Sequence, residues 1–456
     1  MKKIRFFVSL WAGKLVLWYY MKKGRVNDDR PGMRSMRLFF EFVKYVAKPK
    51  IVVAVTGTNG KTSITKIIAD MFEAQGYSVA YNSWGANDNA GYARLFLGAV
   101  NIFNKSTKDV AVVEMDEITV SYMLEMIKPQ YLIINNLATD SLHRNANPDY
   151  VSERIITGCN HYPETVLIIN GDDPICCGIG ENSPRAFFGV TDQGRLKETY
   201  LTNDFPVCPK CGGTPVYKYK NYRHFGEFYC PKCGYKSPER DYFVEEIRDD
   251  SVIISEKNGK NEYPVFSSAL FNIYNLASVV SLFRTMGYAP ETIAELLKQA
   301  KLPENRDRTE VYKGVEIRDL CSKRQNPTAM STTMEYAGKE SGNKAVIMLY
   351  DEILKEESRI EATPYIYSTD YQFLADDSIK HIIVIGQRHK EHRNRLLLAG
   401  VKPEVIQTAE KTEEIDPLIS FSEVDKYIIL HDVMYSITMR DHIIDVIKQN
   451  IDKGGM

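Results

Sequence analysis

The segment 51–72 constrains the fold of this 456-residue chain more than any other segment. Ile51–Thr56 reads IVVAVT, a continuous apolar and β-branched run that is typical of a strand buried on both faces of a parallel sheet. The chain then passes through GTNGKT at 57–62 into apolar residues that recur at helical spacing: Ile64, Ile67, Ile68, Met71 and Phe72. Gly76 follows, where a helix is expected to stop. The sequence therefore predicts a strand, a glycine-rich turn and a helix, which together are the building unit of an α/β fold.

The glycine-rich turn has the chemistry of a phosphate-binding loop. Glycines let the backbone amides curl round a polyphosphate at a helix N-terminus, where the helix dipole favours negative charge. We expect Lys61 to reach the β- and γ-phosphates and the Thr62 hydroxyl to bind Mg²⁺. The whole predicted phosphate site is Gly57, Thr58, Asn59, Gly60, Lys61 and Thr62. Val55 stands where the general motif has its first glycine, but the flanking strand and helix disfavour the alternative of an ordinary turn with a surface lysine.

Three later apolar runs also end in polar residues. The runs at 109–113, 131–134 and 166–169 lead into Glu114, into Asn135-Asn136 and into NGDDP at 170–174. Because ligands of open α/β sheets bind outside the carboxyl ends of the strands, we expect these residues to converge on the phosphate loop. Glu114 is the candidate for a second Mg²⁺ ligand, directly or through water, and the alternative is a surface carboxylate at a strand end. Asp116 and Glu117 are expected at the rim.

Four of the eight cysteines have the spacing of metal ligands. Cys208-Pro-Lys-Cys211-Gly and Cys230-Pro-Lys-Cys233-Gly form two CxxC pairs separated by eighteen residues. Two such pairs close a tetrahedron round Zn²⁺, and four thiolates leave no open position, so the zinc is expected to be structural. Two disulfides are the alternative, which a reducing compartment disfavours. The other four cysteines are expected to be small buried residues: Cys159, Cys176, Cys177 and Cys321.

Residues 217–229 between the two pairs read YKYKNYRHFGEFY, which is basic and aromatic. Such a stretch suits base stacking and phosphate contacts, as in zinc ribbons that bind nucleic acid. A small ribbon also needs aromatic residues simply to pack its hairpin, and we favour that interpretation. The whole chain has 58 Lys and Arg against 59 Asp and Glu, so its composition gives no general attraction to nucleic acid.

Residues 5–20 read RFFVSLWAGKLVLWYY, with basic residues on both sides. The apolar stretch is too short and too interrupted for a transmembrane helix, and its bulky end does not suit a secretory signal. Two interpretations remain open. A helix packed on its own protein or a partner is favoured, and a helix lying at a membrane surface is the alternative.

Several motifs together resemble those of the Mur ligases, the ATP-dependent enzymes that join amino acids to peptidoglycan precursors. They are TGTNGKT at 56–62, EMDE at 114–117, NNLATDSLHR at 135–144, NGDDP at 170–174 and FNIYNLA at 271–277. The resemblance implies that Asn272 and Asn275 lie near the adenine, that Asn136 belongs to the ATP site and that Arg308 reaches the nucleotide from a third domain. His143 is offset from the family's metal-contacting histidine, so it is not assigned as a ligand.

A four-cysteine ribbon inserted in such a central domain resembles one subfamily, the MurT subunits of lipid II isoglutaminyl synthases. The resemblance implies an α/β fold in three parts: an N-terminal helical segment at 1–50, an ATP-binding central domain at 51–309 with a zinc ribbon at about 204–240, and a Rossmann-like domain at 310–456. It implies ATP, Mg²⁺ and structural Zn²⁺ as cofactors and a cytoplasmic protein, at the inner face of the membrane if residues 5–20 touch it. ATP would phosphorylate the α-carboxyl of D-glutamate in lipid II, and ammonia from a GatD-type glutaminase subunit would convert it to D-isoglutamine. No nucleic acid is expected as a partner.

The third domain departs from the subfamily's pattern, in which an Asp-Gly-x-Asp-x-Ser-Trp motif supplies an aspartate to the partner's glutaminase site. Asp351 remains as the turn acid and is the candidate catalytic acid of this domain, but Ala362 stands where the aspartate is expected. Glu357, Glu361 and Asp370 are the candidates to replace it; a solvated charged surface is the alternative. The departure leaves open a diverged Mur-type ligase with another carboxylate or amine, and the ribbon leaves open a nucleic-acid-binding NTPase.

Overall fold

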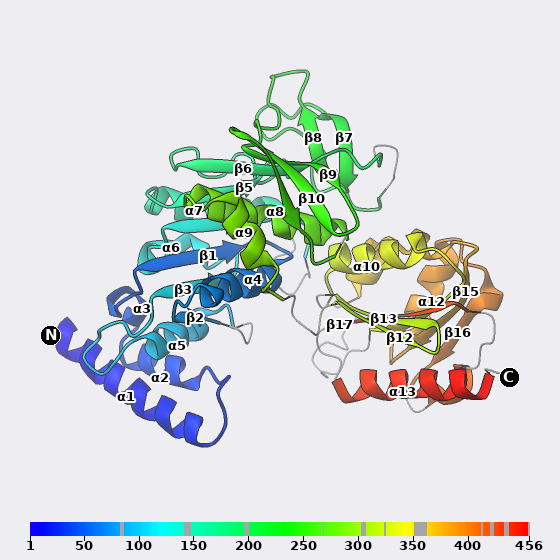
Figure 1. Ribbon diagram of the computed structural model, residues 1–456, viewed down its shortest axis with the longest axis horizontal. Coiled ribbons are helices and arrows are strands. Elements are labelled where there is room, and N and C mark those ends of the chain that lie inside the picture. The colour runs from blue at the N-terminus through cyan, green and yellow to red at the C-terminus, as the bar shows by residue number, and fades with distance from the viewer. Residues whose placement is uncertain are drawn as a thin grey trace. The chain divides into compact units, whose positions relative to one another are not determined.

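The computed structural model describes residues 1–82, 86–140, 147–195, 200–267, 269–301, 307–322, 325–350, 363–411, 414–419, 424–432 and 437–454. The chain forms two compact units (Figure 1). Unit 1 comprises Met1–Leu137, Asn147–Glu198 and Asn203–Leu302, and unit 2 comprises Ala138–Ala146, Thr199–Thr202 and Pro303–Met456. The N-terminal helical segment and most of the expected central domain thus fall into unit 1, whereas 138–146, 199–202 and 303–309 fall into unit 2.

A nine-stranded sheet with the order β11-β10-β9-β6-β5-β4-β1-β3-β2 forms the centre of unit 1. The strands from β2 to β9 in this order pair in parallel, and β10 and β11 add an antiparallel edge. The bounds are β1 Ile51–Thr56, β2 Val79–Tyr81, β3 Val110–Glu114, β4 Tyr131–Ile134, β5 Val166–Asn170, β6 Arg185–Val190, β9 Tyr242–Ile247, β10 Ser251–Glu256 and β11 Gly259–Pro264. A separate antiparallel hairpin, β7 Val216–Tyr222 and β8 Phe225–Tyr229, lies between the two cysteine pairs.

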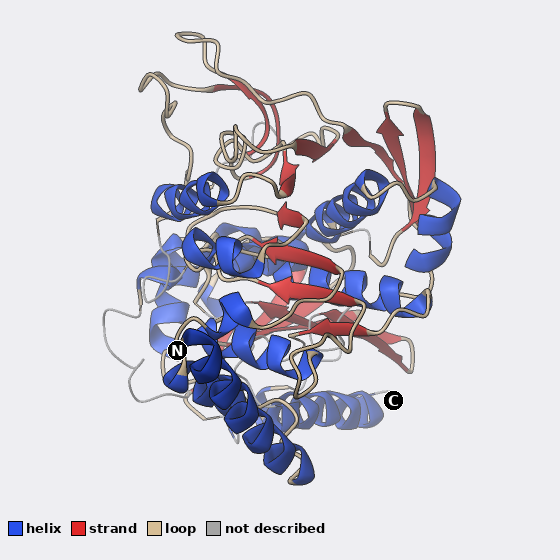
Figure 2. Ribbon diagram, turned by 90° about the vertical axis from the view of Figure 1, so that its left-hand side faces the viewer, coloured by secondary structure: helices blue, strands red, loops and turns tan. Residues whose placement is uncertain are grey.

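Helices cover both faces of this sheet, as Figure 2 shows. Strand β1 divides its side chains between two cores: Val52 and Ala54 pack on one face, and Val53 and Val55 on the other. This explains why β1 is apolar throughout rather than alternating. The helices of unit 1 are α1 Lys2–Lys22, α2 Arg30–Leu38, α3 Phe42–Tyr45, α4 Lys61–Ala74, α5 Asn89–Ala99, α6 Val120–Ile127, α7 Pro148–His161, α8 Leu270–Thr285 and α9 Pro290–Leu297.

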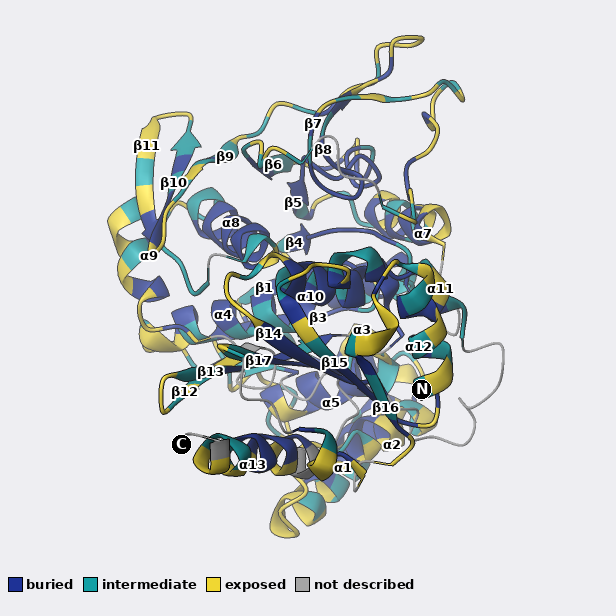
Figure 3. Ribbon diagram, turned by 90° about the vertical axis from the view of Figure 1, so that its right-hand side faces the viewer, coloured by how far each residue is buried: buried dark blue, intermediate teal, exposed yellow. Residues whose placement is uncertain are grey.

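Unit 2 has a six-stranded sheet with the order β12-β13-β17-β14-β15-β16, in which only β12 runs antiparallel to its neighbour. Strands β14 and β17 are buried, as Figure 3 shows. The strands are β12 Asp307–Tyr312, β13 Val315–Ser322, β14 Lys344–Leu349, β15 Ile379–Ile385, β16 Ile406–Ala409 and β17 Lys426–Asp432. The helices are α10 Pro327–Lys339, α11 Pro364–Ser368, α12 His389–Leu398 and α13 Ile437–Gly454, with short 3₁₀ turns η3 Tyr371–Leu374, η4 Pro403–Val405 and η6 Asp416–Leu418. The expected doubly covered α/β architecture is confirmed.

The N-terminal helix packs on unit 1 through one face. Phe6, Leu10 and Leu17 are buried in the same core cluster as Tyr92 and Phe96 of α5. This is the packed helix that the sequence favoured. Among the residues that the structure describes, no helix is both long enough and apolar enough to cross a membrane.

Candidate functional site

The phosphate-binding loop joins the end of β1 to the start of α4, and two glycines are needed there for steric reasons. Gly60 has a φ of +88°, and a Cβ atom on it would lie 2.3 Å from Oδ1 of Asn275. A Cβ atom on Gly57, whose φ is +133°, would lie 2.9 Å from the carbonyl oxygen of Asn136. The loop backbone therefore approaches Asn136 and Asn275 too closely for any side chain at Gly57 or Gly60.

Asparagine side chains from the end of β4 and from α8 hold the loop in place. Asn136 accepts a hydrogen bond from the Asn59 amide (2.9 Å) and donates one to the Asn59 carbonyl (3.0 Å). Asn135 donates to the same carbonyl (3.1 Å) and to Oδ1 of Asn275 (2.9 Å). Asn136 and Asn275, which we expected at the nucleotide, thus contact the loop that would bind it.

Asn272, on α8, differs from these residues. Its side chain is buried, and its Nδ2 atom has no hydrogen-bond partner among the described atoms. A buried amide donor without a partner costs free energy, so this atom fits an acceptor supplied by a ligand. It suits the nucleotide contact that was predicted for Asn272.

Lys61 makes a buried ion pair that the sequence did not predict. Its Nζ atom lies 2.6 Å from Oε1 of Glu117 and donates to the carbonyl of Gly57, also at 2.6 Å. Burial lowers the pKa of Lys61, but Glu117 and Glu114 raise it by more, so the net shift is upward. The prediction that Glu117 lies at the rim is wrong, because its side chain is buried against the lysine; Asp116 is half-buried.

The predicted magnesium ligands lie together. The Thr62 hydroxyl donates to Oε2 of Glu114 over 2.9 Å, and Asn87 donates to the other carboxylate oxygen over 3.2 Å. The Asn82 side chain accepts a hydrogen bond from the Glu114 backbone amide and donates one to the Glu114 backbone carbonyl. A hydroxyl and a carboxylate beside a phosphate loop are hard oxygen donors of the kind that Mg²⁺ prefers, so this pair fits the ion.

The four predicted zinc ligands also converge. Their sulfur atoms lie within 4.8 Å of one another, with 3.6 Å between Cys208 and Cys233 and 3.5 Å between Cys211 and Cys230. A tetrahedral site with Zn–S bonds of about 2.3 Å needs sulfur atoms about 3.8 Å apart, so the cluster fits zinc. Gly212 and Gly234 adopt positive φ and donate their amides to the carbonyls of the first cysteine of each pair, both at 2.9 Å.

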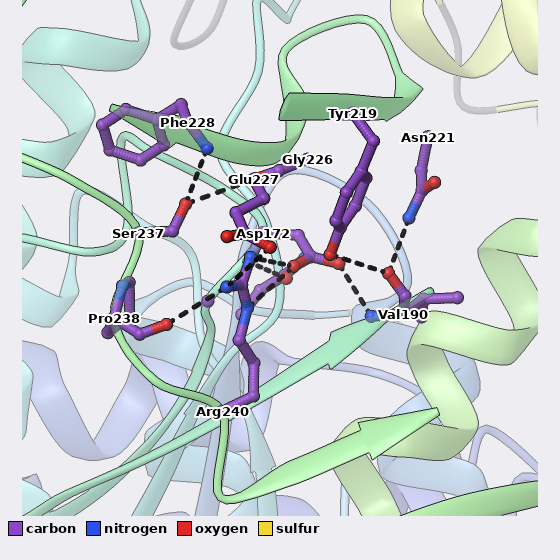
Figure 4. A network of polar contacts seen from close by, with 12 residues as sticks. Asp172, Val190, Tyr219, Asn221, Gly226, Glu227, Phe228, Ser237, Pro238 and Arg240 are labelled. Atoms are coloured by element: carbon purple, nitrogen blue, oxygen red, sulfur yellow. Dashed lines mark hydrogen bonds and ion pairs between the residues drawn. The ribbon is translucent and has the colours of Figure 1, made fainter. Parts of the chain in front are cut away.

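A buried carboxylate ties the ribbon hairpin to the sheet, as Figure 4 shows. Asp172, just after β5, accepts hydrogen bonds from Nε (3.1 Å) and Nη2 (2.7 Å) of Arg240 and from the Val190 amide (2.7 Å). Its carbonyl accepts from the Gly226 amide of the hairpin (2.7 Å). Burial raises the pKa of Asp172, against the opposing effect of Arg240.

The same network reaches α8. Tyr274 donates to Oδ2 of Asp172 over 2.8 Å, and Asn221 of the hairpin donates to the Tyr274 hydroxyl over 3.0 Å. Because Tyr274 is followed directly by Asn275, one helix contacts both the ribbon and the phosphate loop. Sequence reasoning missed Asp172, Arg240 and Tyr274 as a group, since partners 68 and 102 residues apart leave no local signal.

The ribbon's aromatic stretch is mostly buried. Among the aromatic residues of 217–229, Tyr219, Tyr222, Phe225 and Phe228 are buried, Tyr217 is half-buried and Tyr229 is exposed. The rings therefore pack the hairpin, as favoured from the sequence, and do not form an exposed platform for stacking bases.

Several predicted residues lie in unit 2 or near it. Arg308, on β12, is exposed, with Nη2 3.8 Å from Glu310. Asp351, Glu357 and Glu361 lie outside the described residues, as does His143. Asp370 is buried and accepts a hydrogen bond from the Leu201 amide (2.7 Å), so its carboxylate is bonded inside unit 2.

Three of the remaining cysteines are made unreactive by burial. Burial raises the pKa of Cys159 to about 12, and it raises the pKa values of Cys176 and Cys177 well above the ordinary thiol value. The expectation that all four are buried is wrong for Cys321, which is half-buried on β13.

Comparison with known proteins agrees with this geometry. Residues 55–206 match the family model of the Mur ligase middle domain, and residues 324–433 match that of the MurT ligase C-terminal domain. A pseudomurein peptide ligase type C from Methanothermus fervidus superposes with a TM-score of 0.68 at 19% identity, covering 91% of this chain and 81% of that one. MurF from Acinetobacter baumannii gives 0.64 at 16%, with 91% and 80% covered.

The fold, the loop and the two matched domains define the class: the chain has the Mur ligase fold, its segments 55–206 and 324–433 match Mur-type ligase domains, and it is an ATP-dependent ligase. Within that class it is similar to the subunit MurT of lipid II isoglutaminyl synthase (glutamine-hydrolyzing). The identity is 26% to the Streptococcus pneumoniae protein over 90% of both chains. It is 24% to the Staphylococcus aureus protein over 84% of this chain and 85% of the other.

Proposed function

We propose that this chain is the synthetase subunit of a glutamine-dependent amide ligase that converts the D-glutamate of lipid II to D-isoglutamine. The observation that carries the proposal is the similarity to MurT subunits over nine tenths of the chain, which includes the MurT-type C-terminal domain. A phosphate loop with lysine, threonine and carboxylate in contact supports the ATP-dependent half of the reaction.

In the proposed reaction, the α-carboxylate of D-glutamate attacks the γ-phosphorus of ATP, and ADP leaves. Ammonia then attacks the acyl carbon, phosphate leaves with the bonding electrons, and the nitrogen loses a proton to give the amide. The loop amides and Lys61 neutralise charge on the transferring phosphoryl group, as preorganised donors do in phosphoryl transfer. Thr62 and Glu114 would hold Mg²⁺, which would supply positive charge to stabilise the phosphates during transfer. Arg308 and Asp351 are proposed to contribute from unit 2, as the family resemblance implies.

Ammonia would come from a separate GatD-type glutaminase subunit. The segment that differs from the MurT pattern lies mostly outside the described residues, and Asp370 is engaged within unit 2. Of the candidate replacement acids, Glu357 and Glu361 therefore remain for the partner's glutaminase site. A ligase that uses free ammonia or another amine is the second candidate, and the substitution at Ala362 favours it.

A reconstitution tests these proposals. The full chain is mixed with its glutaminase subunit, lipid II, Mg²⁺ and ATP, and the amidated product is measured with glutamine or with ammonium as nitrogen source. Product from both supports the proposed function, and product from ammonium alone favours the second candidate. No product from either, with ATP still bound, refutes lipid II as the acceptor.

Two lysines of α4 give a matched pair for the ATP site. Lys61→Ala should abolish ATP turnover because it removes the cation at the phosphates. Lys66→Ala, one turn further along the same helix, removes only a pair with Asp70 and should leave turnover unchanged. Turnover by Lys61→Ala at the level of Lys66→Ala would refute the assignment of the phosphate loop.

A further inference from the structure

The helix α1 has a second apolar face, which is exposed. While Phe6, Leu10, Gly13 and Leu17 are buried against unit 1, an outer stripe of α1 is exposed: Ile4, Val8, Trp11, Leu15 and Trp18. At 100° per residue, these five positions fall within an arc of about 80° on the side of the helix opposite the buried one. At 1.5 Å per residue, the stripe is about 21 Å long. An apolar stripe of this length on the surface indicates an interaction site.

A neighbouring loop extends this apolar surface. Ile102 and Phe103, which follow α5, have exposed fractions of 52% and 70%. The indole Nε1 of Trp11 donates to the carbonyl of Ile102 over 2.9 Å, so the loop is held beside the outer stripe. Because the only donor of the Trp11 ring is already bonded, its exposed part offers apolar surface alone.

The N-terminal segment that carries the stripe is strongly basic. Residues 1–50 contain thirteen Lys and Arg against three Asp and Glu, a formal charge of +10, whereas the whole chain has −1. No acidic residue occurs before Asp28. At the end of the stripe, Lys22 lies 4.2 Å from the ring centre of Trp18 and Lys23 lies 4.7 Å from that of Tyr19. Aromatic rings and lysines at one end of an apolar stripe are the composition of a helix at a lipid headgroup layer.

We propose that the outer stripe of α1, with Ile102 and Phe103, binds the surface of a membrane that carries anionic lipid. The apolar side chains would enter the boundary between headgroups and acyl chains, and the lysines would contact the headgroup phosphates. Charge favours this occupant over a second copy of the chain, because two stripes facing each other would bring two basic segments together. The proposal goes beyond the ligase activity and does not depend on its substrate.

Substitution suits the test better than truncation, since the other face of α1 is part of the core of unit 1. The stripe variant is Val8→Gln with Leu15→Gln, at positions that are 49% and 66% exposed. The matched control is Val311→Gln with Leu398→Gln, at positions of the same residue types that are 68% and 74% exposed in unit 2. A charge variant replaces Lys22 and Lys23 by Gln.

The full chain is floated with vesicles of neutral phosphatidylcholine or with vesicles that contain about one third phosphatidylglycerol, none of which carries a cell-wall precursor. We expect binding to the anionic vesicles only, a partition coefficient lowered about tenfold in the stripe and charge variants, and no change in the control. Binding should also fall several-fold as NaCl is raised from about 0.1 to 0.5 M.

Failure to bind anionic vesicles, or equal loss in the stripe variant and the control, would overturn the proposal. Sedimentation velocity without vesicles tests the other occupant, a second copy of the chain. A dimer that the stripe variant converts to a monomer would assign the stripe to a second copy and overturn the lipid assignment. Because amidation of lipid II is measured in a separate reconstitution, failure to bind vesicles does not decide the proposed function.

Discussion

Glu117→Gln tests whether the ion pair between Lys61 and Glu117 holds the phosphate loop when no nucleotide is added. The pair is separated by 2.6 Å, and both side chains are almost fully buried. The substitution keeps the size and an oxygen atom but removes the charge that compensates the lysine. Breaking a buried pair costs about 3–5 kcal/mol. Because the amide oxygen can still accept from Lys61, we expect about 3 kcal/mol of lost unfolding free energy for the nucleotide-free chain.

ATP should respond in the opposite direction. In the complex, the phosphates take over the role of counter-charge to Lys61, so the substitution costs less there than in the nucleotide-free chain. If half of the loss is relieved, the variant binds Mg·ATP about tenfold more tightly, since 1.4 kcal/mol corresponds to a factor of ten. The pKa of Lys61 is raised in the folded chain. The ion pair therefore contributes its full stabilisation at any pH below the lysine's pKa in the unfolded chain. That stabilisation is lost only as the pH rises through the higher pKa of the folded chain. Measurements at pH 7.5 therefore observe the full effect.

The assay combines thermal unfolding without nucleotide and calorimetric titration with a non-hydrolysable ATP analogue and Mg²⁺. Glu125→Gln is the matched control, because Glu125 makes an exposed 3.5 Å pair with Lys44 on α3, and such pairs contribute about 0–1 kcal/mol. Stability of Glu117→Gln equal to that of the control would refute the buried pair. Weaker binding of the nucleotide would refute the exchange of partners and would place Glu117 among the groups that bind ATP.

Three further substitutions test other parts of the structure. Gly60→Ala should lower the free energy of unfolding by about 2–3 kcal/mol and abolish nucleotide binding, because the new Cβ atom would clash with Asn275. Gly76 has a similar positive φ but open space around it, so Gly76→Ala should lower the free energy of unfolding by only about 1 kcal/mol. Equal losses in denaturant titrations would contradict the close approach of Gly60 to Asn275. Cys208→Ser should lose zinc, measured by atomic emission, and lower the melting temperature, and full zinc content would contradict the ligand set. Burial lowers the pKa of Lys48 to about 7 in the folded chain. Between pH 7 and about 10 this lysine is therefore protonated in the unfolded chain but largely neutral in the folded chain. The free energy of unfolding should rise over this range by up to about 1.4 kcal/mol per pH unit. Lys48→Met should remove this rise, and an unchanged slope in thermal unfolding would contradict it.

The parts of the site that the sequence predicted are those set by neighbouring residues. A β-branched run, a glycine pair and a helical repeat specify the phosphate loop within about twenty residues, and each CxxC-Gly turn specifies its own backbone. Glu114 was predictable for the same reason, since it ends a buried strand. For these features, local propensity and burial point to the same structure.

The rest depends on contacts between distant residues. Glu117 lies in a short loop after β3 without apolar periodicity, so nothing local shows that it turns inward to Lys61, 56 residues away. Asn136 and Asn275 were assigned to the ATP site, yet their contacts to the loop follow only from the pairing of β1 with β4 and from the packing of α8 on the sheet. The two apolar faces of α1 also depend on distant contacts, because the sequence does not show which face packs on unit 1 and which is exposed.

The network round Asp172 places the zinc ribbon and the nucleotide site on one helix. The hairpin contacts Tyr274, and its neighbour Asn275 contacts the residues that hold the phosphate loop. A chain made under zinc shortage would lose the fixed hairpin and, with it, one support of α8. The cell's supply of zinc would then limit how much of the chain becomes competent to use ATP, although an ion held by four thiolates has no open position for chemistry.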